Sequence, residues 1–275
     1  MNSFLPTILT EPFVIRALIA AIVLAVSGGI IGSFIQMRGM SFYTDTISHS
    51  TFTGVALGVL LGIDVGASAG IFAIVVGLAV LLIRKRTRLS FDTILGVLFA
   101  SVAALGIFLL TFIRGVRIDL FGLLFGDILA LSNADVITIL IAATVSLTVL
   151  WTIREQLILE IVHPELARVE GVPVERNDVI FGIVVACMIA LGIKLIGIIL
   201  LSGLFLIPSA TSYLLSRSMH DLLWGSATVG LMSAIIGITL SALLDTPTGP
   251  TIVLVSSAFF VVALCLRPLF IARHA

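Results

Sequence analysis

The chain has 275 residues, of which 60% are hydrophobic and only 11% are charged. A soluble domain is on average about 45–50% apolar and about 25% charged, so this composition excludes a soluble globular enzyme and a disordered chain. The 15 Lys and Arg residues balance the 15 Asp and Glu residues, which leaves no net positive charge to attract a nucleic acid. The composition therefore indicates a protein whose solvent is the lipid bilayer.

Nine apolar segments follow one another along the chain as candidate membrane spans. A span needs about 20 mostly apolar residues, because a rise of about 1.5 Å per residue has to cross about 30 Å of hydrocarbon. The seventh segment is short, and Pro208 is expected to break or kink it, so the sequence predicts an all-α, polytopic membrane protein with eight or nine spans. The segments are Phe13–Met37, Phe42–Gly62, Val65–Ile83, Thr93–Ile113, Ala134–Ile153, Val179–Leu201, Gly203–Leu215, Leu222–Leu244 and Pro250–Pro268.

Basic residues set the expected orientation, because cytoplasmic loops are enriched in Lys and Arg. The densest basic loop contains Arg84, Lys85, Arg86 and Arg88, so we place it in the cytoplasm. Threading nine spans from there puts the amino terminus outside, the carboxyl terminus inside, and the long polar segment Arg154–Asp178 on the cytoplasmic side. No separately folded soluble part remains, so residues 1–275 are expected to form a single transmembrane domain.

Glycines recur at four-residue intervals in several of the segments. Such spacing lets helix backbones approach closely in lipid, so we expect close helix contacts at these positions. They are Gly28 and Gly32; Gly54, Gly58 and Gly62; and Gly66 and Gly70.

The second segment carries two ionisable residues four positions apart, Asp45 and His49. Ionisable groups inside a span are costly, which makes them candidates for function. On a helix the two side chains share one face, so a carboxylate oxygen and an imidazole nitrogen can reach one divalent cation, and two copies of the chain would supply four such ligands. The structural alternative is an Asp–His hydrogen bond at a helix start, with Thr44 or Asp45 as the cap.

Two further charged residues interrupt apolar stretches. Lys194 lies in the sixth segment, where it either lines a pathway, forms an ion pair or extends to the cytoplasmic interface. Asp127 interrupts the stretch Leu120–Leu131, which is expected to lie at the membrane interface. The sequence does not assign a role to either residue.

The cytoplasmic segment His163–Pro173 predicts a short helix, since Pro164 suits a first turn and Gly171 suits the residue after a helix end. This helix would present charged side chains to a cytosolic partner: Glu165, Arg168 and Glu170. The chain has no GxxxxGK[ST], HExxH or GxSxG motif, so it is expected neither to bind nucleotide through a P-loop nor to be an enzyme.

Seven motifs occur in an order that is typical of one family. They are Arg38-Gly39-Met40-Ser41 followed by Asp45-Thr46-Ile47-Ser48-His49; Leu89 through Gly96; Leu124 through Leu129; Ala167 through Pro173; Gly197 through Leu201; Ile207 through Thr211; and Asp245 through Gly249. From about Phe13 to Pro268 the chain resembles the integral-membrane permease of ABC transporters of the metal-specific ABC-3 type, which import zinc, manganese or iron.

The resemblance implies a multi-pass permease domain in the bacterial inner membrane, with a coupling loop at residues 154–178. Its implied partners are two cytosolic ATPase subunits, an extracytoplasmic metal-binding protein and a second permease copy. No cofactor is implied, because the metal ion is the transported substrate. Asp45 and His49 match the family's metal path, and the helix that docks into the ATPase is matched by Glu165, Leu166, Ala167, Arg168, Glu170 and Gly171.

The chain departs from the family pattern at three places. His163-Pro164 stands where an acidic pair is usual, Lys194 where Arg is frequent, and Asp127 where a small residue is usual. Two other functions stay open, a secondary metal transporter or channel that works alone and a siderophore- or vitamin-type ABC permease. The sequence does not choose among the three metals, nor between a homodimer and a heterodimer of permeases.

Overall fold

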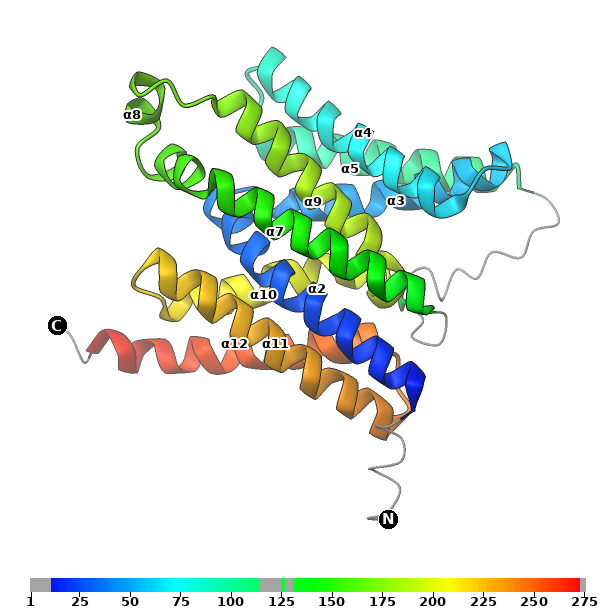
Figure 1. Cartoon of the computed structure of the whole chain (residues 1–275). Helices are drawn as coiled ribbons and strands as arrows, with labels where there is room; N and C mark the ends of the chain where they lie inside the picture. The colour runs from blue at the N-terminus through cyan, green and yellow to red at the C-terminus, as the bar shows by residue number, and fades with distance from the viewer. Residues whose placement is uncertain (1–10, 114–124, 127–130, 273–275) are drawn as a thin grey trace. The chain divides into compact units, whose positions relative to one another are not determined.

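The computed structural model describes residues 11–113, 125–126 and 131–272, and within these residues all regular secondary structure is helical (Figure 1). The prediction of an all-α, polytopic membrane protein is therefore confirmed. The helices are α2 (Pro12–Met37), α3 (Ser41–Leu61), α4 (Val65–Arg86), α5 (Phe91–Leu110), α7 (Asn133–Val162), α8 (Pro164–Val169), α9 (Val174–Ile196), α10 (Ile198–Leu215), α11 (Met219–Leu244) and α12 (Thr248–Ala272).

Each of the nine predicted segments corresponds to one long helix. By length and composition, seven helices within the described residues can cross a membrane: α2, α4, α5, α7, α9, α11 and α12. The other two are α3, which contains Asp45 and His49, and α10, whose residues Leu201–Leu215 form a shorter apolar helix. The stretch Leu120–Leu131 lies largely outside the described residues.

Two predicted boundaries in the sixth and seventh segments were wrong. Helix α9 ends at Ile196 and α10 begins at Ile198, because Gly197 adopts φ 84°, a left-handed conformation that interrupts the helix. The break after Leu201 therefore does not exist, and α10 has 18 residues. Pro208 lies inside α10 without breaking it.

Most of the expected polar loop Arg154–Asp178 is helical. Helix α7 has 30 residues and is therefore about 45 Å long, which exceeds the thickness of the hydrocarbon layer. Its last turns, the short helix α8 and the first turn of α9 together fill most of the predicted loop. The predicted short helix inside this segment is thus confirmed.

The chain divides into two compact units. The first, which we call the α3 unit, consists of Met37–Ile118 and Thr144–Leu191; the second, the α11 unit, consists of Met1–Gln36, Asp119–Ala143 and Gly192–Ala275.

Helix α3 packs closely against α4 within the α3 unit. A Cβ atom at Gly54 would lie 2.7 Å from the Cα atom of Ala69, and one at Gly58 would lie 3.0 Å from the Cβ atom of Ser68. The Ser68 hydroxyl donates to the Gly54 carbonyl at 2.7 Å, a bond that this close approach permits. The predicted close contact is confirmed at Gly54 and Gly58, whereas Gly62 ends α3 with φ 66°.

Helix α3 is also bonded to α5, through hydroxyl groups. Thr53 donates to the Val102 carbonyl at 2.6 Å, and Thr46 reaches the Leu95 carbonyl at 3.4 Å. Within the described chain, Gly66 and Gly70 do not make the predicted close contact. Their nearest neighbours are the Asp64 Oδ1 atom at 3.4 Å and the Ala190 Cβ atom at 3.9 Å, which leave room for a side chain.

In the α11 unit, α2 packs against α10 and α11 through glycine. A Cβ atom at Gly29 would lie 2.6 Å from the Ser226 carbonyl oxygen, and one at Gly32 would overlap the Phe205 carbonyl oxygen. The Ser33 hydroxyl donates to the Ser226 hydroxyl at 2.8 Å. The predicted close contact is therefore confirmed at Gly32, whereas a Cβ atom at Gly28 would lie 3.4 Å from the Phe205 ring, an ordinary contact distance.

Replacing Gly32 by alanine should destabilise the protein, because the new methyl group meets backbone that cannot rotate away. Overpacking of this kind costs about 1–3 kcal/mol. Gly96→Ala is the matched control, because Gly96 is also inside a helix but no described atom lies within 4 Å of the place that a Cβ atom would take, so alanine there should be neutral or should stabilise by about 0.5–1 kcal/mol. Thermal unfolding of the purified protein in detergent measures both, and equal midpoints would contradict the packing argument.

Candidate functional site

Helix α3 places Asp45 and His49 well inside its first turns, not at its cap. The helix begins at Ser41, Met40 is the N-cap residue, and no side chain makes a capping hydrogen bond. The Thr44 hydroxyl is buried and donates to the Ser41 carbonyl at 2.8 Å. The alternative in which Thr44 or Asp45 caps the helix was therefore wrong.

The His49 ring has a defined tautomer and a defined orientation. Its Nδ1 atom lies 3.0 Å from the backbone carbonyl oxygen of Asp45. A carbonyl oxygen only accepts, so Nδ1 of the neutral ring carries the proton and Nε2 keeps its lone pair. The ring packs against Phe99 of α5, with centroids 4.5 Å apart and planes inclined at 59°. Nε2 is thus the nitrogen that can bind a metal ion.

The Asp45 carboxylate is half-buried. No described residue forms an ion pair with it, and the His49 ring is bonded to the Asp45 backbone, not to its side chain. Within the described part of the chain, no group of three or more His, Cys, Asp or Glu side chains lies close enough to hold a metal ion. One copy of the chain therefore offers two candidate ligands at this place, and further ligands have to come from elsewhere.

A third polar group on the same helix was missed by the sequence analysis. Ser48 is fully buried, and its hydroxyl has no hydrogen-bond partner in the described structure. Nearby hydroxyls on α3 donate to the carbonyl three residues earlier, as Thr44 does to Ser41 and Ser50 to Ile47. An unpartnered buried hydroxyl is costly, and Ser48 lies three residues from Asp45 and beside His49. Its signal in the sequence is its position between those two residues.

Helix α8 presents an apolar pair as well as charges. Leu166 is 45% exposed and Val169 is 84% exposed, and at a spacing of three residues they lie on one face. Glu165, Arg168 and Glu170 are exposed as expected, whereas Ala167 is fully buried and anchors the helix. Exposed apolar side chains next to one another are typical of a partner contact, and Val169 was not among the predicted residues.

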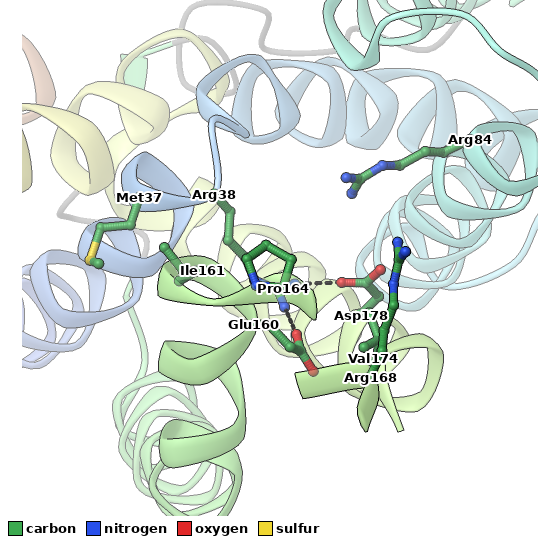
Figure 2. Close-up of a pocket in the computed structure, with 9 residues that line it drawn as sticks. All are labelled: Met37, Arg38, Arg84, Glu160, Ile161, Pro164, Arg168, Val174 and Asp178. Atoms are coloured by element: carbon green, nitrogen blue, oxygen red, sulfur yellow. Dashed lines mark hydrogen bonds and ion pairs between the residues drawn. The ribbon is translucent and has the colours of Figure 1, made fainter. Parts of the chain in front are cut away.

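The helix ends beside α8 are held by a buried charge cluster that involves Arg38. The Arg38 guanidinium donates to Glu160 in the last turn of α7 and to Asp178 near the start of α9, the latter at 2.6 Å (Figure 2). The Arg38 and Glu160 side chains are 8% and 6% exposed. Asn177 donates to the second Glu160 oxygen at 2.7 Å, and the Arg38 guanidinium lies 5.3 Å from the Phe181 ring centroid.

A cavity of about 320 Å³ opens beside this cluster. It is lined by α8 residues, by the cluster and by the end of α4, so that the Arg84 and Arg168 side chains both face it (Figure 2). In the sequence, Arg38 is recognisable only as part of a motif. Its partners are 122 and 140 residues away along the chain, and no local pattern indicates such a pairing.

Two residues discussed from the sequence cannot be placed. Asp127 lies outside the described residues, and so does the side chain of Lys194, although its backbone belongs to α9.

Comparison with known proteins places these features in a family. The model of the ABC 3 transport family matches residues 10–267. The chain is 34% identical to the high-affinity zinc uptake system membrane protein ZnuB of Haemophilus influenzae, over 91% of this chain and 96% of that protein. It is 33% identical to the manganese transport system membrane protein MntC of Halalkalibacterium halodurans, over 98% of this chain and 92% of that protein.

A solved structure of PsaBC from Streptococcus pneumoniae in complex with Fab has the same fold. The two chains superpose with a TM-score of 0.84 at 30% sequence identity, over 96% of this chain and 95% of that one.

Ser48→Ala tests whether the Ser48 hydroxyl has a structural role. Because this hydroxyl makes no hydrogen bond in the described structure, its removal should leave the thermal midpoint unchanged or raise it. Ser226→Ala is the matched control, because Ser226 is equally buried but donates to the Leu222 carbonyl at 2.7 Å and accepts from Ser33; it should lose about 1 kcal/mol. Equal losses in thermal unfolding would show that Ser48 has a structural partner.

Proposed function

Because the chain belongs to the ABC 3 transport family, we propose that it is the membrane permease subunit of an ATP-driven importer, and that its substrate is a divalent transition-metal ion, zinc or manganese. The observation that carries the proposal is near full-length similarity to one relative named for zinc and another named for manganese. Iron, which the sequence also allows, is not the named substrate of either relative. The chain is a multi-pass protein of the inner membrane, and its long apolar helices suit that location.

The proposed ion path runs along the face of α3 that carries Asp45 and His49. The carboxylate and the His49 Nε2 atom are ligands that suit both zinc and manganese. The Nδ1 hydrogen bond to the Asp45 carbonyl fixes the ring orientation, as outer-shell bonds do at metal sites. Two ligands from one chain hold an ion weakly enough to release it, and a second permease copy would complete a four-ligand site.

Ser48 supports the same path. In lipid an unpartnered hydroxyl is unfavourable, unless an ion or its water bonds to it during transport. We therefore assign Ser48 to the polar face that the ion passes, next to Asp45 and His49.

The energy source lies in other subunits. The chain has no P-loop, so we propose that cytosolic ATPase subunits hydrolyse ATP, and that an extracytoplasmic binding protein delivers the ion. Helix α8 is the proposed ATPase contact, with Leu166 and Val169 as its apolar centre. Glu165, Arg168, Glu170 and Gly171 surround this centre, and the buried Ala167 ties it to the membrane part.

His49→Ala and Asp45→Ala should each reduce metal uptake about tenfold or more, because each removes one of two ligands that this chain supplies. Uptake of radioactive zinc and manganese is measured in vesicles that contain the permease, its ATPase and its binding protein, at equal permease abundance. His220→Ala is the control, because His220 lies in the first turn of α11, which belongs to the other compact unit of the chain. Wild-type uptake in both ligand variants would exclude the proposed ion path.

The same vesicles distinguish the importer from a transporter that works alone. Uptake should require ATP and both partner proteins. Uptake by the permease alone, without ATPase, would contradict the importer and favour a secondary transporter or channel.

Leu166→Ser combined with Val169→Ser should weaken ATPase binding more than tenfold. Burial of a Leu or Val side chain is worth about 1.5–3 kcal/mol, and about 1.4 kcal/mol corresponds to a factor of ten. Co-purification of the ATPase with the tagged permease measures the effect. Leu89→Ser is the control, because Leu89 is 54% exposed on the same predicted side of the membrane; an equal loss with Leu89→Ser would contradict a specific role of α8.

A further inference from the structure

One guanidinium group bonds the helix ends on both sides of α8. Glu160 lies four residues before Pro164, the first residue of α8, and Asp178 lies near the start of α9, which follows α8. Both carboxylates bond to Arg38, which lies in the short connection between α2 and α3. Any displacement of α8 that also moves the end of α7 and the start of α9 therefore moves Arg38 as well.

The cluster is built to transmit such a displacement. The guanidinium is planar and donates from two separate nitrogens, so it fixes direction as well as distance. Asn177 occupies the second Glu160 oxygen and also donates to Gln156 at 3.0 Å. A buried ion pair adds little net stability over apolar packing; its main consequence here is to hold three chain segments in one geometry.

Arg38 leads directly to the proposed ion path. It lies three residues before Ser41, the first residue of α3, and Asp45 follows Ser41 by about one helical turn. A second contact links α9 to the same end of α3, because the Tyr43 hydroxyl donates to the Gly182 carbonyl at 3.3 Å. Gly182 and Gly77 leave the space that the Tyr43 ring occupies. The start of α3 is thus bonded to α9 at two places.

The cluster also contains an acceptor that is not used. The Asn177 Oδ1 atom is buried and has no partner among the described residues. The amide cannot simply be turned round, because its nitrogen faces a Glu160 oxygen, which accepts. The adjoining cavity is faced by the Arg84 and Arg168 guanidinium groups (Figure 2), which are donors. The cavity beside Arg38, Glu160 and Asp178 therefore holds further donors within the space next to the cluster, which is what a second arrangement of its bonds would need.

We propose that Arg38 is a positioning residue that couples α8 to the ion-binding face of α3, through its paired bonds to Glu160 and Asp178. This inference rests on the proposed function, in which α8 contacts the ATPase and α3 carries the ion ligands. When α8 moves with the ATPase, the ends of α7 and α9 move with it, and Arg38 shifts the start of α3. ATP hydrolysis and ion release are then linked through this cluster.

Asp178→Asn is the decisive variant, because it removes one charge and keeps the shape of the side chain. In vesicles with ATPase and binding protein, the number of ATP molecules hydrolysed per zinc or manganese ion taken up should rise at least about fivefold. The ATPase should still co-purify in wild-type amount. Glu175→Gln is the matched control, because Glu175 lies three residues before Asp178 on α9 but forms an exposed ion pair with Lys85; its ratio should equal that of the wild type.

Arg38→Lys keeps the charge but loses the planar fork, and its ratio should lie between those of the wild type and Asp178→Asn. If Asp178→Asn does not reach the membrane, the ratio of Arg38→Lys tests the proposed coupling instead. A wild-type ratio in the variant that folds would overturn the proposal, and so would a parallel fall of hydrolysis and uptake at an unchanged ratio, which is the result of a merely structural role. If the wild-type complex itself takes up no metal, the proposed function fails instead.

Discussion

A polar group inside the bilayer has no water to bond to, and this constraint explains most side-chain bonds on the long helices. Serine and threonine hydroxyls donate to carbonyl groups one turn earlier on the same helix, as Ser27, Ser33 and Thr46 do. Others bridge to a neighbouring helix, as Thr53 and Ser68 do. Against this background a polar group without a partner stands out. On α3 the Ser48 hydroxyl is such a group, and the Asp45 carboxylate and the His49 Nε2 atom belong to the same part of the helix.

Because lipid is as apolar as the helix surfaces, no hydrophobic force drives the helices together in the bilayer. Close backbone contact has to hold them instead. Glycine provides that contact at Gly54 and Gly58 in the α3 unit, and at Gly29 and Gly32 in the α11 unit. In the α3 unit its consequence reaches the site, because α3 is held to α4 by glycine and to α5 by two hydroxyl bonds. His49 therefore faces Phe99 on a fixed neighbour, and this contact orients its ring.

The sequence predicted the parts of this protein that depend on neighbouring residues. Apolar length located the nine long helices of the described residues, spacing placed Asp45 and His49 on one face, and Pro164 with Gly171 located α8. Gly197 was missed as a helix end because a single glycine in an apolar run has no flanking turn residues, and Pro208 was expected to interrupt a helix that continues through it. Val169 was missed because an apolar residue is normally expected to be buried, whereas this side chain is 84% exposed. The Arg38 cluster could not be predicted from neighbouring residues, because its partners come together only when distant helix ends meet in the folded chain.

The chain thus contains two kinds of buried polar chemistry that follow opposite rules. In the cluster of Arg38, Glu160 and Asp178, the charged groups pair with one another, so their bonds fix the geometry of the helix ends. On α3, the proposed ligands form no ion pair with the described residues, which leaves the Asp45 carboxylate and the His49 Nε2 atom available to an ion. An importer needs both, since an ion ligand that was also a structural bond would have to break whenever cargo passed. In the proposed mechanism, separating the two along seven residues lets one set of bonds move the start of α3 while the other groups hold the ion.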